Sequence, residues 1–395
     1  MSIEQRTQVG IIGAGPSGLM LGQLLSLHGI ESVIVESRSQ SYVIDRVRAG
    51  VLEQGTVDLM REVGLGERLG RQGLRHEGIH LAFNGRRHRI DMTALTGGRA
   101  IAIYGQNEVL RDLIDARVAA ALPLHFEVPA VAIRDIETIQ PVIEYEAAGE
   151  RKRIRCDFIA GCDGYHGIAR AAIPDGALQS YERTYPFAWL GVLADAPPTS
   201  DELVYSLHPR GFALFSMRSP TVTRLYLQCD PDTDITEWSD DRVWSELTKR
   251  LATDDGWAPA EGNITQKAVT PMRSFVSEPM HYGRLFLAGD AAHIVPPTGA
   301  KGLNLAMADV YRLSQALRDF YKTSRTDLLA TYSTRGVRRT WAAQRFSWLM
   351  TSLLHRINPD NPFDYKRQLA ELEYLVGSRA AMTSLAESYV GIAFD

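Results

Sequence analysis

The stretch Val9-Gly-Ile-Ile-Gly13-Ala-Gly15-Pro-Ser-Gly18 decides the fold of this chain. A short β-branched run passes through a GxGxxG pattern into apolar residues at helical spacing. Gly13 suits the tight turn after the strand, Gly15 lets the backbone approach a pyrophosphate, and Gly18 lets helix and strand pack closely. Because a helix N-terminus attracts anions, the stretch predicts a phosphate-binding turn.

The segments around this turn complete a βαβ unit. Residues 7–12 predict a strand, 16–27 a helix and 31–36 a second strand. Glu36 ends the second strand, where its carboxylate can accept hydrogen bonds from a ribose hydroxyl pair. The combination indicates dinucleotide binding, and it leaves open whether the dinucleotide is FAD or NAD.

The length of 395 residues predicts two or three hydrophobic cores. Short alternating runs in residues 181–269 favour a mixed or antiparallel sheet, and residues 124–145 also have strand character. Apolar residues every three or four positions predict helices over residues 51–63, 108–121, 303–320, 328–355 and 365–389.

Composition argues against several classes of partner. Charged residues make up 23% and apolar residues 45%, which is typical of a globular enzyme, and a net charge of -4 gives no reason to expect nucleic acid. We expect no membrane segment, because no apolar stretch approaches the ~20 residues of a spanning helix. The N-terminus lacks a secretion signal, and the cysteines lack metal-ligand spacing, so we expect a cytoplasmic protein with free thiols and no metal site.

Two later motifs bear on the choice between FAD and NAD. Gly161-Cys-Asp163-Gly164 follows a strand-like run, and Gly289-Asp290 ends another such run before a helix begins. An aspartate at the carboxyl end of a strand can accept a hydrogen bond from a ribityl hydroxyl, and the helix start offers N–H groups to a flavin ring. Taken alone, each motif could instead be an Asp-Gly turn or a helix cap.

In this order after GxGxxG, the motifs resemble the aromatic-hydroxylase family of single-component FAD monooxygenases. The resemblance runs from Thr7 to about Ile392 and is most specific in Arg46-Val-Arg48-Ala-Gly-Val-Leu-Glu-Gln-Gly, His208-Pro-Arg-Gly-Phe-Ala-Leu and Gly289-Asp-Ala-Ala-His-Ile-Val-Pro-Pro-Thr-Gly-Ala-Lys-Gly-Leu-Asn304. There is no second GxGxxG, which fits a family that binds NAD(P)H transiently on the FAD domain.

The resemblance implies a fold of the α/β class with a discontinuous Rossmann-like FAD-binding domain of the glutathione-reductase βαβ type. That domain is expected to comprise residues 1–76, 103–180 and 270–320. A mixed-sheet substrate-binding domain is expected over residues 77–102 and 181–269, and a C-terminal helical region or interface over residues 321–395.

A hairpin in the expected substrate domain offers a carboxylate clamp. Ser216 and Arg218 are two positions apart and share one face of a strand, and after a turn Arg224 and Tyr226 again share a face. Arg218 presents a planar fork suited to bidentate carboxylate binding, with Ser216 and Tyr226 as further donors. From the residues alone, the alternative is an amphipathic edge hairpin with a solvated polar face.

By resemblance, this hairpin holds the carboxylate of a phenolic acid, with 4-hydroxybenzoate as the expected substrate. Tyr205 then contacts the 4-hydroxyl, Tyr389 lies behind it, and His76 lies at the solvent end of a proton relay. Such a relay has a chemical reason, because the ring reacts far better as a phenolate and a free phenol has a pKa of about 10. The resemblance also places the Pro297 carbonyl near the phenol and Thr298 at the pocket wall.

The resemblance assigns further residues to the two cofactors. Beyond the glycines and acids above, FAD contacts are implied for Ser17, Arg46, Arg48, Gln106, Arg224, Lys301 and Asn304, and Arg224 matches a position implicated in flavin movement. NADPH contacts are implied for Arg38, Tyr42, Arg48, His166 and Arg273. Ser37 stands where NADPH-preferring members carry a basic side chain, so the use of NADH stays open.

The resemblance implies that NADPH reduces FAD, that the reduced flavin activates dioxygen at its C4a atom, and that 4-hydroxybenzoate becomes 3,4-dihydroxybenzoate. A homodimer is also implied. One alternative is an FAD-dependent dehydrogenase or amine oxidase, and another is a non-enzymatic flavin-binding protein; neither has a use for a carboxylate clamp opposite a tyrosine relay. A sister hydroxylase of 3-hydroxybenzoate, salicylate or 3,4-dihydroxybenzoate is the third.

Overall fold

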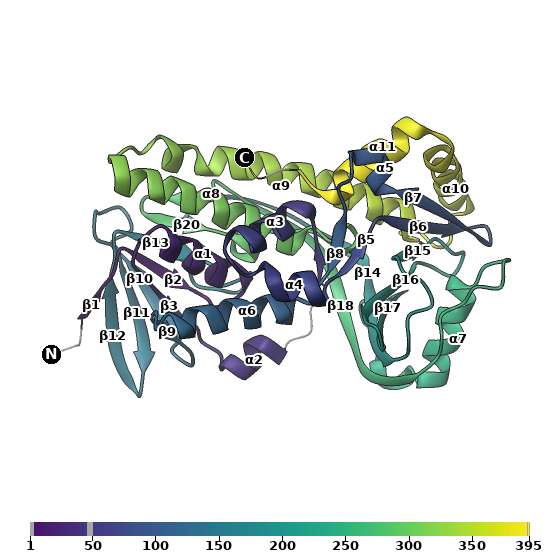
Figure 1. Cartoon of the computed structure of the whole chain (residues 1–395), viewed down its shortest axis with the longest axis horizontal. Coiled ribbons are helices and arrows are strands. Elements are labelled where there is room, and N and C mark those ends of the chain that lie inside the picture. The colour runs from purple at the N-terminus through teal and green to yellow at the C-terminus, as the bar shows by residue number, and fades with distance from the viewer. Residues whose placement is uncertain (1–3, 46–49, 393, 395) are drawn as a thin grey trace.

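The computed structural model describes residues 4–45, 50–392 and 394. Figure 1 shows an elongated molecule with sheets towards both ends, and the long helices α8 (Gly302–Thr323) and α9 (Asp327–Leu354) lie along its upper side. No described helix is long and apolar enough to cross a membrane. The architecture confirms the α/β class expected from the sequence.

A six-stranded sheet forms around the GxGxxG turn. Its order is β19-β20-β13-β2-β3-β9, and all neighbours except the antiparallel edge pair β19 and β20 are parallel. The strands are β2 (Val9–Ile12), β3 (Ser32–Val35), β9 (Leu124–His125), β13 (Phe158–Gly161), β19 (His281–Tyr282) and β20 (Leu285–Leu287). Because parallel strands end at the same sheet edge, the turns after β2, β3, β13 and β20 come together.

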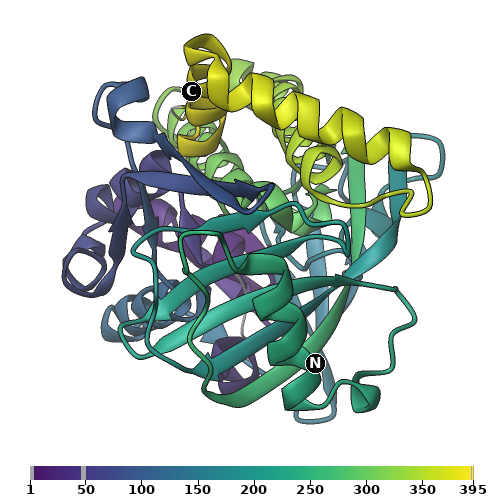
Figure 2. The same ribbon diagram turned by 90° about the vertical axis from the view of Figure 1, so that its right-hand side faces the viewer.

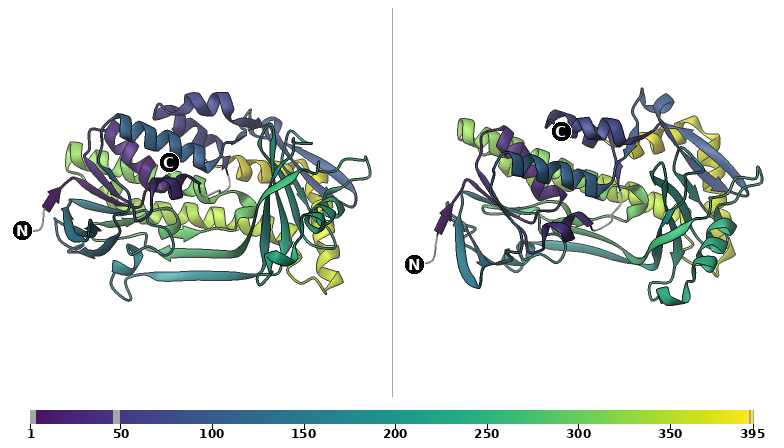
Figure 3. Two further views of the ribbon diagram at one scale, coloured as in Figure 1. Left: turned by 90° about the horizontal axis from the view of Figure 1, so that it is seen from below. Right: turned by 60° about the horizontal axis from the view of Figure 1, so that its bottom comes forward.

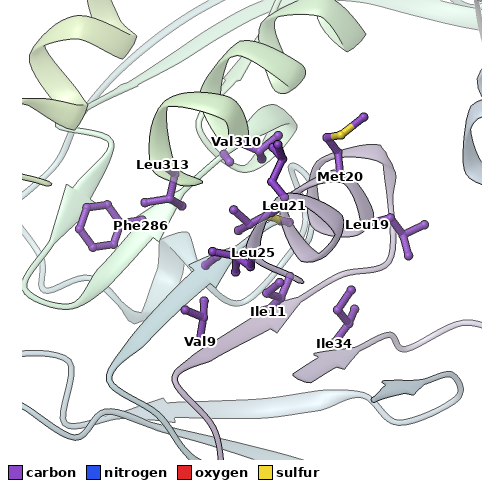
Figure 4. Close-up of a cluster of buried hydrophobic side chains, with 14 of the residues drawn as sticks. Val9, Ile11, Leu19, Met20, Leu21, Leu25, Ile34, Phe286, Val310 and Leu313 are labelled. Carbon is purple, nitrogen blue, oxygen red and sulfur yellow. The ribbon is translucent and has the colours of Figure 1, made fainter. Parts of the chain in front are cut away.

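Helix α1 (Pro16–Leu27) covers one face of this sheet and has the bounds expected from the sequence. Its Leu21 and Leu25 are fully buried, in one cluster with Val9 of β2 and Val310 of α8 (Figure 4). Burial of each such leucine contributes about 1.5–3 kcal/mol. The turn between β2 and α1 is therefore anchored on both sides by the core.

An eight-stranded sheet forms the second region, in the order β21-β18-β14-β17-β16-β15-β6-β7. The strands are β6 (Gly78–Phe83), β7 (Arg86–Asp91), β14 (Gln179–Asp195), β15 (Val204–Ser206), β16 (Ala213–Ser219), β17 (Val222–Cys229), β18 (Asn263–Glu278) and β21 (His293–Ile294). At 17 and 16 residues, β14 and β18 are far longer than the short strands expected. They pair antiparallel and link the two regions of the molecule (Figure 3). The two halves of each strand have different surroundings, so the alternation of apolar and polar residues does not reveal one continuous strand.

The two faces of this sheet are covered by different helices. Helix α7 (Asp240–Leu251), which was not expected, packs Val243 and Leu247 against Phe215 and Leu225. Its buried apolar residues Val243, Trp244, Leu247 and Leu251 have helical spacing, so the signal was present in a segment where only strands were expected. The opposite face lies towards α10 (Pro362–Gly377) and α11 (Arg379–Val390), which are yellow in Figure 2.

Two expected helices differ in the structure. The helix expected over residues 365–389 is divided between α10 and α11, because Ser378 accepts a hydrogen bond from the Ala381 N–H and caps a new helix. The helix expected over residues 51–63 starts later, as α3 (Gln54–Glu62), after the short strand β4 (Val51–Leu52).

The remaining elements surround the two main sheets. A four-stranded sheet, β1-β12-β11-β10, and a three-stranded sheet, β4-β8-β5, contain β1 (Glu4–Arg6), β5 (Leu74–His76), β8 (Ile101–Ile103), β10 (Ala130–Arg134), β11 (Val142–Ala147) and β12 (Glu150–Arg155). The other helices are α2 (Gln40–Asp45), α4 (Gly66–Gln72), α5 (Met92–Thr96) and α6 (Gln106–Ala119). Because β18 runs through the boundary expected at residue 270, the division into domains stays a prediction.

Candidate active site

The GxGxxG turn lies at the carboxyl end of β2. Gly13 has a φ of +103°, and a Cβ there would lie 2.4 Å from the carbonyl oxygen of Cys162. A Cβ on Gly18 would lie 1.9 Å from the carbonyl oxygen of Gly13, whereas a Cβ on Gly15 would meet nothing within 4 Å. Packing therefore demands glycine at Gly13 and Gly18, and the turn leaves open space at Gly15, beside the start of α1.

Two acids border this turn. Glu36 accepts hydrogen bonds from the N–H groups of Ala14 and Arg38, each at 2.8 Å. Asp163 Oδ2 accepts from the Ala169 N–H at 2.9 Å, whereas Oδ1 is buried without a hydrogen-bond partner among the described residues. Burial raises the pKa of the Asp163 carboxyl. Buried carboxylate oxygens normally accept hydrogen bonds, so a ligand hydroxyl is a suitable donor to Asp163 Oδ1.

The Gly289-Asp290 motif packs against the start of α1. Gly289 has a φ of +62°, and a Cβ there would lie 2.5 Å from Ser17 Oγ. The Gly289 N–H donates to Asp309 Oδ2 at 3.1 Å, and the same oxygen lies 2.6 Å from His293 Nε2. The buried Asp309 of α8 thus fixes the backbone that carries Asp290.

These features fit FAD. The space at Gly15 can accommodate a pyrophosphate at the start of α1, where no side chain caps the helix. Glu36 suits a ribose, and the unpaired Asp163 oxygen suits a ribityl or ribose hydroxyl. Arg46 and Arg48, which were expected near the phosphates, lie outside the described residues.

Three other expected flavin contacts lie at helix starts. Gln106 is the first residue of α6, and Lys301 and Asn304 lie at the start of α8. Lys301 is buried, and burial lowers the pKa of its ammonium despite an ion pair of 2.5 Å with Glu53. The Asn304 amide is hydrogen-bonded to the protein alone, through Val51, Glu53, Thr56 and Ala300. A contact between Asn304 and a flavin would therefore have to come from its backbone.

Three of the residues expected to bind substrate share one face of the eight-stranded sheet. Tyr205 of β15 and Tyr226 of β17 both lie opposite Leu214 of β16. Ser216 and Arg218 follow Leu214 at intervals of two positions. Because opposite residues and alternate residues share a face, the strand register brings Tyr205, Ser216 and Tyr226 to one side, away from α7. The pairing of β16 with β17 is irregular between Met217 and Ser219, so the register does not fix the side of Arg218.

Two arginines shape the electrostatics of this face. Arg224 Nε donates to the Tyr226 oxygen at 2.6 Å, so the Tyr226 proton is left to donate elsewhere. Arg218 Nη2 donates to Asn107 Oδ1 at 2.6 Å, at the start of α6. Burial and the charge of Arg224 lower the pKa of the Arg218 guanidinium, which still stays protonated. An anion bound here would offset both effects.

Tyr205 and Tyr389 form a buried pair. Their hydroxyl oxygens are 2.5 Å apart, and the residues are only 2% and 1% exposed. Burial raises the pKa of each tyrosine. The hydroxyls therefore keep their protons and can pass a proton along by exchanging donor and acceptor roles.

Pro297 and Thr298 lie in a short turn that leads to Lys301. The Thr298 hydroxyl is buried and lies 3.1 Å from the Thr351 hydroxyl of α9. The Lys301 ammonium donates to the Tyr389 carbonyl at 3.1 Å, which places this turn next to the tyrosine pair.

His76 differs from its expected position at the solvent end of a relay. It ends β5 and is only 1% exposed, and neither ring nitrogen has a hydrogen-bond partner in the described part of the chain. Burial lowers the pKa of His76 to about 4, so the ring is neutral at pH 7. The expectation of a solvent-facing ring is wrong, because β8 and its neighbours enclose a side chain that looks like a surface residue in the sequence.

Comparisons with known proteins agree with this geometry. Residues 6–347 match a family described as FAD binding domain. The p-hydroxybenzoate hydroxylase of Acinetobacter baylyi is 50% identical over 390 residues, which make up 99% of this chain and 96% of that protein. The chain belongs to the FAD-dependent aromatic hydroxylases.

Other aromatic hydroxylases are more distant. The 3-(3-hydroxy-phenyl)propionate/3-hydroxycinnamic acid hydroxylase of a Mycobacterium species is 26% identical over 370 residues, a match that covers 90% of this chain and 61% of that protein. The crystal structure of p-nitrophenol 4-monooxygenase from Pseudomonas putida covers 97% of both chains with a TM-score of 0.85 at 19% identity. This likeness shows a shared fold.

The residues that this aromatic hydroxylase was expected to use for NADPH form two groups. The Arg38 guanidinium lies 5.2 Å from the ring centre of Tyr42, which is 48% exposed. His166 and Arg273 both lie against Tyr165: the ring centre of His166 is 4.9 Å and the Arg273 guanidinium is 4.8 Å from its ring centre. Their roles in NADPH binding stay predictions.

The sequence interpretation missed an aromatic wall behind the clamp. Trp189 stacks on Phe212 with ring centres 5.1 Å apart and lies 4.7 Å from Tyr226. Its Nε1 donates to His355 Nε2 at 2.7 Å, and burial lowers the pKa of His355 to about 3. The neutral histidine thus fixes the indole, a contact that no local pattern could reveal.

The space at Gly15 leads to a test of FAD binding by this aromatic hydroxylase. We expect Gly15→Ala to leave the thermal unfolding of the apoprotein unchanged but to weaken FAD binding about tenfold or more, because a methyl group would occupy space for the pyrophosphate. Gly13→Ala, with its positive φ, should lower the stability of the apoprotein itself. Titration of apoprotein with FAD, followed by flavin fluorescence, would measure both variants, and equal FAD affinity in Gly15→Ala and wild type would argue against this cradle.

Proposed function

We propose that this aromatic hydroxylase converts 4-hydroxybenzoate to 3,4-dihydroxybenzoate with FAD, NADPH and dioxygen. One observation carries the proposal: Tyr205, Ser216 and Tyr226 share one face of the eight-stranded sheet, with Arg218 next along β16, and the Tyr205 hydroxyl pairs with that of Tyr389 in α11. These residues would form a carboxylate clamp and a proton relay. The 50% identity to a p-hydroxybenzoate hydroxylase over nearly the whole chain supports the same substrate.

The clamp would bind the substrate carboxylate. Arg218 supplies two parallel N–H donors, and Ser216 and Tyr226 supply hydroxyl donors from the same face. Arg218 is four positions from Leu214, the residue opposite Tyr205, and lies at an irregularity of β16, so the two points are at most about 13 Å apart along the strand. Side chains reaching inwards from these two points can grip opposite ends of one para-substituted ring.

The tyrosine pair would take the proton from the substrate phenol. Tyr205 would accept the proton of the substrate phenol and donate its own proton to Tyr389. Tyr389 would in turn release its own proton, for which neutral His76 is the proposed acceptor. Ionisation places electron density on the ring carbon next to the phenolate, which is the 3-position. The relay therefore selects where the new hydroxyl forms.

FAD, when bound, supplies electron transfer from NADPH and the activation of dioxygen. The protein must keep water away from this chemistry. Tyr205 and Thr298 are 2% and 1% exposed, and Trp189 closes the pocket behind the clamp at 3% exposed. The substrate face is therefore dry enough to favour hydroxylation over loss of hydrogen peroxide.

Anaerobic stopped-flow reduction by NADPH tests the proposal, with and without 4-hydroxybenzoate, followed by product analysis after air is admitted. Substrate should accelerate reduction by several orders of magnitude, and 3,4-dihydroxybenzoate should form. Formation of hydrogen peroxide without an aromatic product would contradict the assignment. A sister hydroxylase would instead turn over 3-hydroxybenzoate, salicylate or 3,4-dihydroxybenzoate faster than 4-hydroxybenzoate.

NADPH as the electron donor forms part of the same proposal. We expect Arg38→Ala to raise the KM for NADPH about tenfold, because a guanidinium beside Tyr42 suits the 2′-phosphate. NADH, which lacks that phosphate, is the control substrate, and its KM should stay within about twofold. An equal rise in the KM for NADPH and for NADH would show that Arg38 does not recognise the 2′-phosphate.

The proposal also includes a cytoplasmic homodimer. Trp341 and Trp348 of α9 are 42% and 36% exposed, which is unusual for tryptophan on a monomer surface and suits an interface. Light scattering after gel filtration would measure the mass directly, and a monomer at micromolar concentration would contradict the dimer.

A further inference from the structure

The end of helix α11 and the turn that follows it are held by three cationic side chains from distant parts of the chain. The last carbonyl groups of a helix have no partner within it, and cations are favourable at this end of the helix dipole. Lys301 Nζ donates to the Tyr389 carbonyl at 3.1 Å, and Arg99 Nη2 donates to the Gly391 carbonyl. Arg339 Nη2 donates to the Ile392 carbonyl at 2.9 Å.

A buried acid lies within this set of cations. Glu53 is 4% exposed, and its carboxylate lies 2.5 Å from Lys301 Nζ and 3.9 Å from Arg339 Nη2. Gly391 has a φ of +88°, and a Cβ there would lie 1.8 Å from Glu53 Oε2. The backbone at Gly391 is therefore pressed against a fixed carboxylate, and it has little freedom to move.

Phe394 docks the same segment onto the helices around the FAD cradle. Its ring centre lies 5.6 Å from that of Tyr311 in α8, and the Arg339 guanidinium lies 5.2 Å from it. A Cβ on Gly55 of α3 would lie 3.3 Å from the same ring. The segment after α11 thus connects the relay tyrosine to α3, α8 and α9.

We propose that Arg99 and Arg339 are positioning residues for proton transfer. By binding the carbonyls that follow α11, they hold the Tyr389 hydroxyl within hydrogen-bonding reach of Tyr205. The separation of 2.5 Å leaves little tolerance, since a shift of one ångström would take the pair beyond an ordinary hydrogen bond. The inference rests on the proposed function, because it assumes that this pair carries the proton of the bound phenol.

The test uses the FAD-loaded Arg99→Gln and Arg339→Gln variants. Ultraviolet difference spectra over a pH series would give the apparent pKa of bound 4-hydroxybenzoate, and steady-state assays would give kcat and KM. We expect the apparent pKa of the bound phenol to rise by about one unit and kcat at neutral pH to fall about tenfold. The KM should stay within about threefold, and alkaline pH should restore most of kcat.

Two variants serve as controls. Arg345→Gln removes an exposed arginine whose Nη2 donates to the Ser388 hydroxyl of α11 at 3.3 Å and to none of the three carbonyls above, and its pH profile should match that of wild type. Arg99→Lys keeps a charged donor and should recover most of the loss. If either glutamine variant fails to fold, the other one and Arg99→Lys decide the question.

The outcomes separate this inference from the proposed function. If the bound phenol has the same apparent pKa in wild type and in the folded glutamine variants, the positioning role is overturned and the proposed function is not. A higher KM with unchanged kcat and pH profile would overturn the positioning role too, because the arginines would then only shape the pocket. If wild type binds 4-hydroxybenzoate without ionising it at any accessible pH, the proposed relay fails, and the inference fails with it.

Discussion

Replacing Arg218 by alanine should raise the Kd for 4-hydroxybenzoate about 100- to 10,000-fold. A bidentate guanidinium–carboxylate contact contributes two charge-assisted hydrogen bonds of about 1.5–3 kcal/mol each, and each 1.4 kcal/mol corresponds to a factor of ten in Kd. Arg218→Lys keeps the charge without the fork and should fall between wild type and alanine. Quenching of flavin fluorescence by substrate would measure all three proteins.

Two controls isolate the carboxylate contact. Asn107→Ala removes the acceptor that Arg218 binds at 2.6 Å and leaves the guanidinium in place, so it should change Kd by no more than about threefold. The neutral analogue 4-hydroxybenzyl alcohol should bind to wild type and to Arg218→Ala with similar affinity. A large loss with the neutral analogue would mean that Arg218 supports the pocket rather than the carboxylate.

Replacing Tyr205 by phenylalanine should lower the rate of hydroxylation about 100-fold at neutral pH while the Kd for substrate changes only a few-fold. Positioned proton transfer contributes about 10²–10⁴ in rate, and Tyr205 is the first member of the relay. A substrate phenol without this partner has a pKa near 10, so the rate in the variant should climb as pH rises towards that value. Single-turnover product formation between pH 6 and 10 would show the profile.

The matched control for this variant is Tyr185→Phe. Tyr185 is also buried on the eight-stranded sheet, but its hydroxyl pairs with Ser274 at 3.0 Å rather than with Tyr389. Its loss should leave the pH profile unchanged. Wild-type rates at neutral pH in Tyr205→Phe would show that the phenol loses its proton by another route, such as direct transfer to water.

The sequence by itself determined the parts of this protein that depend on spacing along a few residues. The glycine spacing of the GxGxxG turn follows from the geometry of one strand and one helix, and α1 has the expected bounds. The prediction that Ser216 and Tyr226 share a face follows from the two-residue period of a hairpin, and the strand register agrees with it. Arg218 lies at an irregularity of the ladder, so its place in the clamp stays a prediction. Family membership follows from longer runs that contain these same features.

Tertiary structure decided what depends on partners far away in the chain. His76 looks exposed in the sequence and is buried, and the Asn304 side chain is paired with Val51, Glu53, Thr56 and Ala300. Trp189 contacts His355 across 166 positions, and the carbonyls of Tyr389, Gly391 and Ile392 accept from cations of three separate segments. Burial and hydrogen-bond pairing depend on all neighbours in space. A local sequence pattern can therefore predict the residues of this site, but only the fold determines which of their polar atoms are available to a ligand.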